Sequence, residues 1–288
     1  MRQLIWKDLI FCSIIFIGRG SRMQQNILDI YHHLVKQYED LADEEKKAIL
    51  IYKSKIFDFM NAITCVDHFE ELSATEIASR ISDLNKHLDK IEHFRKIVDL
   101  KENMMVKYTI FQGIHLDNPL QLIDDLKREY QILLQAKDKM MLQEDLVVYR
   151  GVSLEYLEDV SNLARGNIIS TSIKVEDTEP FLFQKDINIL YVIHLKKGTS
   201  LLVAPVSLVH TYKDQEDYLY HKLNGIEPNL LKLMNRGEEG CQEVILFKDS
   251  LNLLDIQTRK IEKEEDNLII YTVDTEPVIQ FRKNNVKG

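Results

Sequence analysis

The sequence predicts an α+β protein, with helices in the N-terminal half of the chain and strands in the C-terminal half. From residue 23 to about residue 141, apolar residues recur at intervals of three and four, as on one face of an amphipathic helix. After residue 146 they instead form short continuous runs between polar turns, which is typical of buried strands. We therefore expect a helical lobe over residues 23–141 and a strand-rich domain over residues 142–288, with residues 1–22 as a separate N-terminal segment.

A short apolar run at residues 9–17 follows the basic residues Arg2 and Lys7. The run is too short to cross a bilayer, because a membrane-spanning helix needs about 20 apolar residues. Its length suits the core of a signal peptide, but Asp8 interrupts the basic lead and no small-residue cleavage site follows. We expect neither a stable membrane span nor a cleavable signal here, and interpret the run as a packed element or as the result of a start at Met23.

Capping residues mark the start of two helices in the N-terminal half. Ser73 and Glu76 have the spacing of a capping box, in which each side chain accepts a hydrogen bond from the other residue's backbone. The apolar stripe that follows is unbroken as far as Val98, which predicts one long helix. Asn118 and Pro119 suit the N-cap and first turn of another helix, which leads directly to the first strand.

The composition is that of an ordinary globular protein, with 45% hydrophobic and 29% charged residues among 288. The net charge of -9 argues against a nucleic acid partner, because phosphate binding normally requires a basic surface. Cys12, Cys65 and Cys241 are far apart and lack the spacing of metal ligands. We therefore expect free thiols, no zinc site and no other metal.

Three stretches of the C-terminal half combine an apolar strand with polar residues that carry chemistry. In the first, apolar residues lead to Arg150 and Gly151, so a buried strand presents a guanidinium group beside a glycine that a ligand can approach closely. The second, residues 167–172, contains three hydroxyl side chains in a row: Ser170, Thr171 and Ser172. In the third, Glu243 directly precedes an apolar strand, so a carboxylate lies where the strand begins.

An arginine, a serine and a glutamate at strand ends suit a substrate that carries phosphate and ribose and develops positive charge. Arginine matches phosphate bidentately, and a carboxylate can accept hydrogen bonds from sugar hydroxyls and stabilise an oxocarbenium-like centre. Each motif alone also has a plain structural interpretation. Arg150 and Glu243 would suit a surface ion pair, and residues 170–172 would suit a turn cap.

In their order and spacing, the three stretches resemble the Arg-Ser-Glu class of mono-ADP-ribosyltransferases, which includes bacterial toxins and secreted effectors. The resemblance covers residues 146–273. It implies a two-sheet domain with a cleft for NAD, which is a co-substrate, and transfer of ADP-ribose to a protein side chain with release of nicotinamide. It further implies a protein acceptor in a host cell, reached by export without a cleavable signal peptide; a cytoplasmic location is the alternative.

The resemblance also assigns roles to individual residues. Arg150 is expected to hold the phosphate and ribose side of NAD, and Gly151 to present its backbone to the nicotinamide amide. Ser170 orders the pocket, with Thr171 and Ser172 beside it, and Glu243 contacts the nicotinamide ribose as the catalytic residue.

The acceptor side of the predicted site departs from the family. An acidic or amide residue usually stands two positions before the catalytic glutamate and helps to select the acceptor, but here that position is Cys241. Glu239 or Glu238 on the preceding loop could supply the missing group. In the loop of residues 173–186, Phe183 is expected to pack on the nicotinamide ring, although it would equally suit a core position.

Three other functions remain open from the sequence. An NAD glycohydrolase would use the same pocket and transfer ADP-ribose to water. An RNA phosphotransferase of related fold would need a more basic cleft than this acidic sequence offers. A non-catalytic binding module would account for Cys241 and for the long amphipathic N-terminal half.

Overall fold

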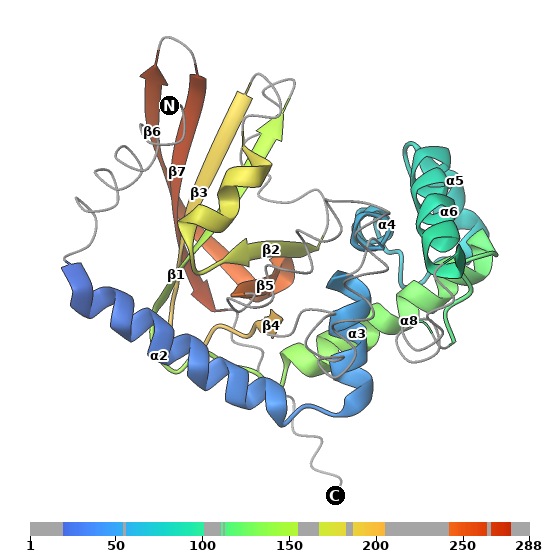
Figure 1. The fold of residues 1–288 in the computed structure, drawn as a ribbon, viewed down its shortest axis with the longest axis horizontal. Coiled ribbons are helices and arrows are strands. Elements are labelled where there is room, and N and C mark those ends of the chain that lie inside the picture. The colour runs from blue at the N-terminus through green and yellow to red at the C-terminus, as the bar shows by residue number, and fades with distance from the viewer. Residues whose placement is uncertain are drawn as a thin grey trace, which may run out of the picture.

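A helical half precedes a sheet in the computed structural model, as the sequence predicts (Figure 1). The structure describes residues 20–53, 56–100, 111, 113–154, 167–182, 187–204, 242–263 and 266–277. Within these ranges the helices are α2 (Gly20–Glu39), α3 (Asp43–Lys53), α4 (Phe57–Thr64), α5 (Ala74–Arg80), α6 (Leu84–Leu100) and α8 (Pro119–Lys137). The strands are β1 (Leu146–Leu154), β2 (Ile168–Ser172), β3 (Ile187–Leu195), β4 (Leu202–Ala204), β5 (Glu243–Phe247), β6 (Leu251–Lys263) and β7 (Asp266–Pro277), with short 3-10 helices η1 (Val175–Phe181) and η3 (Lys248–Ser250).

The capping residues define the helix starts that the sequence predicts. The Ser73 backbone N–H donates to Glu76 Oε2 over 2.8 Å, and the Glu76 backbone N–H donates to Ser73 Oγ over 3.3 Å, which completes the capping box of α5. Asn118 Oδ1 accepts from the Gln121 backbone N–H over 3.2 Å, with Pro119 as the first residue of α8.

The single long helix predicted after Ser73 is wrong, because the structure has two helices there, α5 and α6. Ile81 is extended, with φ −70° and ψ 120°, and Asp83 has a φ of 55°, in the left-handed region that aspartate tolerates better than most residues. The apolar stripe crosses this break because Ile77 and Ile91, on either side, both face the core. Hydrophobic periodicity reports which residues are buried, and it does not report a local change in φ.

The described strands form one hydrogen-bonded sheet in the order β4-β5-β2-β1-β3-β7-β6, so the prediction of two sheets is not confirmed. The join between its two parts is narrow, because β1 pairs with β2 only at Tyr149 and Ser172. By contrast, β1 pairs with β3 along its whole length. Figure 1 shows β2 running across the direction of β3 and β7. A short apolar run between polar turns predicts a strand, but it does not predict whether two groups of strands join in one sheet.

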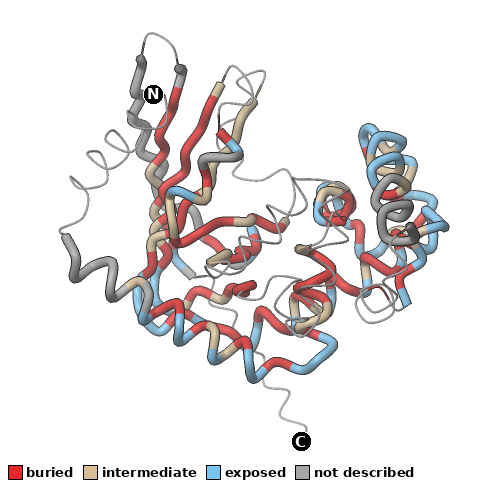
Figure 2. Tube along the Cα trace, in the orientation of Figure 1, coloured by how far each residue is buried: buried red, intermediate tan, exposed pale blue. Residues whose placement is uncertain are grey.

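The main hydrophobic core covers one face of β1, β3 and β7, includes consecutive residues of β2, β4 and β5, and continues into the helices. It contains, among others, Leu34 of α2, Ile49 of α3, Leu133 of α8 and Ile193 of β3. Figure 2 shows the buried residues along the strands and the alternation of buried and exposed residues along α2. A smaller cluster lies apart from this core and includes Tyr149 and Leu182, which follows η1. Side chains from both halves of the chain share the main core. The division into two domains at residue 142 stays a prediction.

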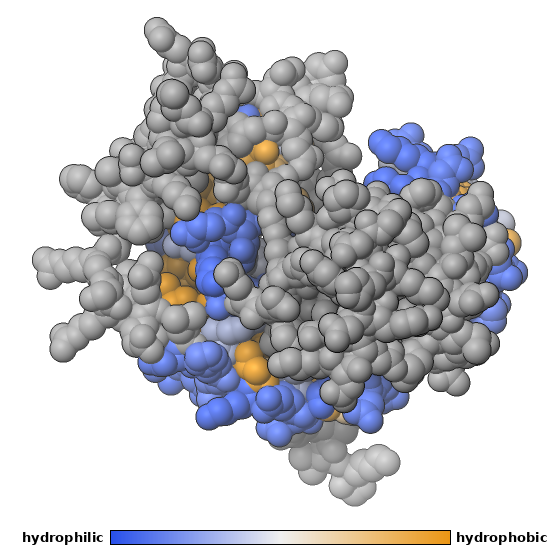
Figure 3. All heavy atoms as spheres, viewed as in Figure 1, coloured by the Kyte–Doolittle hydropathy of each residue, from blue (hydrophilic) through white to orange (hydrophobic). Residues whose placement is uncertain are grey.

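Large apolar side chains are exposed only singly over the part of the chain that the structure describes. They are Phe57, Leu120, Met141 and Phe181. On the face shown in Figure 3, the visible described residues are mostly hydrophilic, with small apolar areas. No described helix combines the length and the apolar character needed to pass through a bilayer.

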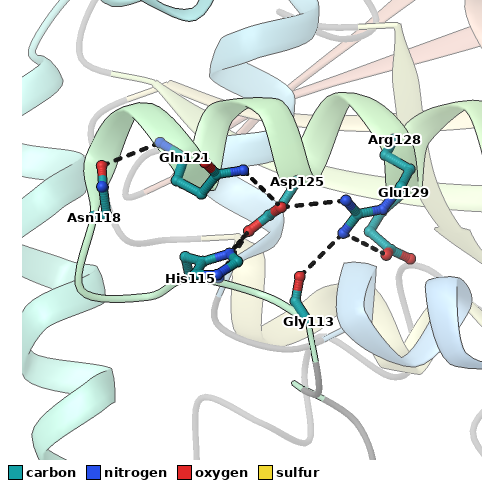
Figure 4. Close-up of polar contacts among 7 residues, drawn as sticks. All are labelled: Gly113, His115, Asn118, Gln121, Asp125, Arg128 and Glu129. Carbon is teal, nitrogen blue, oxygen red and sulfur yellow. Dashed lines mark hydrogen bonds and ion pairs between the residues drawn. The ribbon is translucent and has the colours of Figure 1, made fainter.

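The start of α8 is fixed by a polar cluster around Asp125, whose side chain is only 1% exposed (Figure 4). Asp125 Oδ2 accepts from the His115 backbone N–H over 2.8 Å and lies 2.8 Å from its ring Nδ1. Arg128 bridges Asp125 to the Gly113 carbonyl oxygen. Burial alone would raise the pKa of Asp125, but the hydrogen bonds from His115 and Gln121, with the charge of Arg128, lower it below its ordinary value.

Replacing Asp125 by Asn should lower the free energy of unfolding by about 1–3 kcal/mol at neutral pH, because the variant removes the buried charged acceptor of the His115 backbone N–H and of Arg128. Folding lowers the pKa of Asp125, so its contribution is complete above the unfolded pKa of about 3.9 and is lost as the pH falls through the folded value. The difference between wild type and variant should therefore be constant above about pH 5 and shrink below about pH 4.

Urea unfolding at neutral and acidic pH measures both effects of Asp125→Asn. Asp124→Asn is the matched control, because Asp124 is the exposed neighbour on the same helix and its replacement should change stability little. A stability difference that stayed the same in acid would contradict the role assigned to the carboxylate.

Candidate functional site

The candidate site forms where β1 and β2 separate beside their one paired position. Arg150 follows Tyr149 on β1, and its Nη1 donates to the Ser170 carbonyl oxygen over 2.7 Å. The guanidinium therefore connects the two strands where their backbones no longer pair. Tyr191, the partner of Arg150 in the register of β3, lies on its other side.

Arg150 is a partly buried cation, and one of its donors has no partner among the described residues. Burial lowers its pKa, and the neighbouring groups of Tyr52, Tyr191 and Glu243 oppose that shift. Its Nε is buried and has no hydrogen-bond partner among the described residues. A buried donor on a charged group is costly to leave unpaired. The arrangement therefore suits an anionic ligand that supplies an oxygen acceptor, as a phosphate would.

Glu243, the first residue of β5, has a protein contact at each carboxylate oxygen. Ser170 Oγ donates to Oε1 over 2.5 Å, and Lys53 Nζ forms an ion pair with Oε2. In the register of β2 and β5, Ser172 is opposite Glu243, so Ser170 is its diagonal neighbour on the same face of the sheet. The structure thus brings Arg150, Ser170 and Glu243 together, although the roles assigned to them stay predictions.

Two residues of α3 belong to this site and were missed by the sequence analysis. Lys53, the last residue of α3, contacts Glu243, and their side chains are each 18% exposed. Tyr52 is fully buried, and its pKa is raised by burial and then by the charge of Glu243. A lysine at a helix end normally indicates a solvated position, so no local signal in the sequence linked Lys53 to a distant strand.

The other two hydroxyls beside Ser170 bind protein groups. Thr171 is buried, and its Oγ1 donates to the Val244 carbonyl oxygen over 2.7 Å, which holds β2 to β5. Ser172 Oγ donates to Asp177 Oδ2 over 2.6 Å and accepts from the Lys174 backbone N–H over 3.1 Å. These contacts give both residues a structural role, and their predicted contact with NAD stays a prediction.

Gly151 lies where η1 packs closely against β1. A Cβ atom at this position would lie 2.7 Å from the Thr178 carbonyl oxygen and 3.1 Å from Leu182 Cγ. The glycine is therefore required by the close approach of η1, and its side of the strand cannot accept a larger residue without a backbone shift. Its predicted backbone contact with nicotinamide is a separate matter and stays a prediction.

Four of the predicted site residues lie outside the described residues: Phe183, Glu238, Glu239 and Cys241. Next to Cys241, Gln242 has a buried Oε1 without a hydrogen-bond partner in the described ranges. Within the part of the chain that the structure describes, no group of three or more His, Cys, Asp or Glu side chains is arranged to hold a metal ion.

Solved structures similar to this chain include bacterial ADP-ribosyltransferases. Plx2a, a toxin of Paenibacillus larvae, is 13% identical over 90% of this chain and 96% of its own, with a TM-score of 0.41. An ADP-ribosyltransferase of Clostridium botulinum is 12% identical over 87% of this chain and 96% of its own, also with a TM-score of 0.41. A protein of S. aureus, solved with NAD, is 14% identical over 88% and 95%, again with a TM-score of 0.41. The sequence matches neither a protein-family model nor a curated protein.

Replacing Gly151 by Ala should destabilise the protein by about 1–3 kcal/mol, because the new methyl group overlaps the Thr178 backbone, which cannot rotate away as a side chain could. Thermal and urea unfolding measure this effect. Val152→Ala is the control, since it shortens a half-buried side chain at the next position of β1 and creates no overlap. A Gly151→Ala variant as stable as the wild type would show that η1 does not pack on β1 as described.

Proposed function

We propose that this protein transfers ADP-ribose from NAD to a side chain of a target protein and releases nicotinamide. The observation that supports this most directly is the chain of contacts from Arg150 through Ser170 to Glu243. It places a partly buried cation and an oriented carboxylate in one site, which are the two groups that an anionic substrate with a developing positive centre requires.

In the proposed reaction, the bond between the ribose C1′ and the nicotinamide nitrogen breaks, and nicotinamide leaves with the electron pair. Positive charge develops on the ribose, and the negative charge of the Glu243 carboxylate stabilises it. The acceptor side chain then forms a bond to C1′ and loses its proton. Ser170 orients the carboxylate, and Arg150 binds the phosphate and ribose side of NAD and so fixes the distance between the reacting groups.

The acceptor is a protein side chain in this proposal, and its residue type stays open. The sequence departs from the family at Cys241, so an arginine acceptor has no support from that position. As part of the same proposal, we retain Glu239 as a contributor to acceptor selection and Phe183 as a contact of the nicotinamide ring. A host-cell target and secretion also belong to this proposal, and they rest on the motif resemblance alone.

Glu243→Gln should abolish nicotinamide release while the protein stays folded, because the variant keeps the shape of the side chain and removes its charge. Incubation with tagged NAD and a cell lysate, with labelled protein and free nicotinamide both measured, gives the result. Glu276→Gln, at an exposed position on β7, is the charge-matched control and should leave activity unchanged.

The same measurement separates the competing functions. Labelled proteins that disappear in Glu243→Gln support the transferase. Nicotinamide release without labelled protein identifies a glycohydrolase. Full activity in Glu243→Gln would refute the catalytic assignment, and a wild-type protein that neither binds NAD nor releases nicotinamide would favour a non-catalytic module.

Arg150→Lys should weaken NAD binding by about 10-fold or more, because lysine cannot make the paired contacts of a guanidinium and loses a charge-assisted hydrogen bond. Calorimetry with NAD measures the dissociation constant. Arg128→Lys, which changes a half-exposed arginine in the Asp125 cluster, controls for the substitution itself. Equal NAD affinity in wild type and Arg150→Lys would place the phosphate contact elsewhere.

A further inference from the structure

We propose that Lys53 is a positioning residue for Glu243, an inference that rests on the function proposed above. Its ammonium group is paired with Glu243 Oε2, while Ser170 binds Oε1 of the same carboxylate. The two contacts come from different parts of the fold, the end of α3 and the middle of β2. Together they hold both oxygens of the group that must face the ribose.

The need for a second contact follows from the torsional freedom of a glutamate. Rotation about the last bond of the side chain is broad and has only a weak preference for particular angles. A single hydrogen bond at Oε1 leaves the carboxylate free to rotate about that oxygen. A cation at Oε2 removes this freedom, so the carboxylate is held in one plane before the substrate arrives.

Lys53 is itself held in place by the helix that carries it. It follows the fully buried Tyr52, and Ile49 and Ile51 of the same helix are completely buried. Packing of α3 therefore fixes the backbone from which the Lys53 side chain reaches Glu243. Because both side chains are only 18% exposed, the pair is less screened by water than a surface ion pair.

The two protein contacts still allow the carboxylate to bind substrate. An ionised carboxylate has about four acceptor positions, so a ribose hydroxyl can share it with a serine hydroxyl and an ammonium group. The ammonium also has an opposing effect, because its charge disfavours positive charge on the nearby ribose. If positioning of the carboxylate dominates, replacing the lysine lowers the rate. If repulsion of the ribose charge dominates, replacing it raises the rate, so experiment can separate the two effects.

Lys53→Met tests the proposal, because methionine has a similar length and neither the charge nor the hydrogen-bond donors. Nicotinamide release should fall roughly 10- to 100-fold in kcat, with KM for NAD nearly unchanged, since a misplaced reacting group costs rate. Lys53→Arg should recover most of the lost rate. Lys139→Met is the matched control and should leave kcat unchanged. Lys139 pairs with Glu45 in the first turn of α3, at the opposite end of the helix from Lys53.

Thermal unfolding of each variant shows whether a change in rate reflects loss of the fold. If Lys53→Met does not fold, Lys53→Gln, which keeps a neutral donor, must show the lower kcat in its place. An unchanged or higher kcat, or a rise in KM alone, would overturn the positioning role while leaving the proposed function intact. Failure of the wild-type protein to bind NAD or release nicotinamide would overturn both.

Discussion

The partly buried guanidinium of Arg150 is the constraint on which the rest of the site depends. A charge removed from water must be met by oriented acceptors, and the strands provide one of them by separating: β1 and β2 pair only at Tyr149 and Ser172, and the Ser170 carbonyl oxygen then accepts from Arg150 over 2.7 Å. The place where the sheet stops pairing is therefore also the place where it can hold a charge. An anionic substrate would complete the arrangement by meeting the donor that has no partner among the described residues.

Three consecutive hydroxyl residues of β2 show how one short strand serves both the fold and the site. Because successive side chains of a strand point to opposite faces, Ser170 and Ser172 share a face and Thr171 points away from it. Thr171 binds the backbone of β5, which sets the strand that begins with Glu243. Ser172 binds Asp177 of η1, and η1 in turn packs on Gly151. Of these three residues, only Ser170 donates to the Glu243 carboxylate. Thr171 and Ser172 instead hold β5 and η1 in place around it.

Local signals in the sequence predicted more of this structure than distant ones did. The capping box at Ser73 and the N-cap at Asn118 depend on residues three positions apart, and both are confirmed. The strands that carry Arg150, Ser170 and Glu243 were also predicted, because apolar runs with polar ends are visible in the chain itself. The break at Asp83 was missed because burial continues across it, and the shared sheet was missed because pairing between distant strands leaves no local pattern. Lys53 and Tyr52 were missed for the same reason as the sheet.

The helical half of the chain is consequently part of the site. Lys53 and Tyr52 reach Glu243 and Arg150 only because α3 packs against α8, and α8 begins where Asp125 binds the preceding segment. The strands alone would lack the ion pair of Lys53 with Glu243 and the buried Tyr52 that interacts electrostatically with Arg150. Water in their place would weaken every electrostatic interaction in the site, since the energy of two charges falls with the dielectric constant between them. The two halves of the sequence, which differ so clearly in periodicity, therefore have to fold onto one core before the carboxylate and the guanidinium can act together.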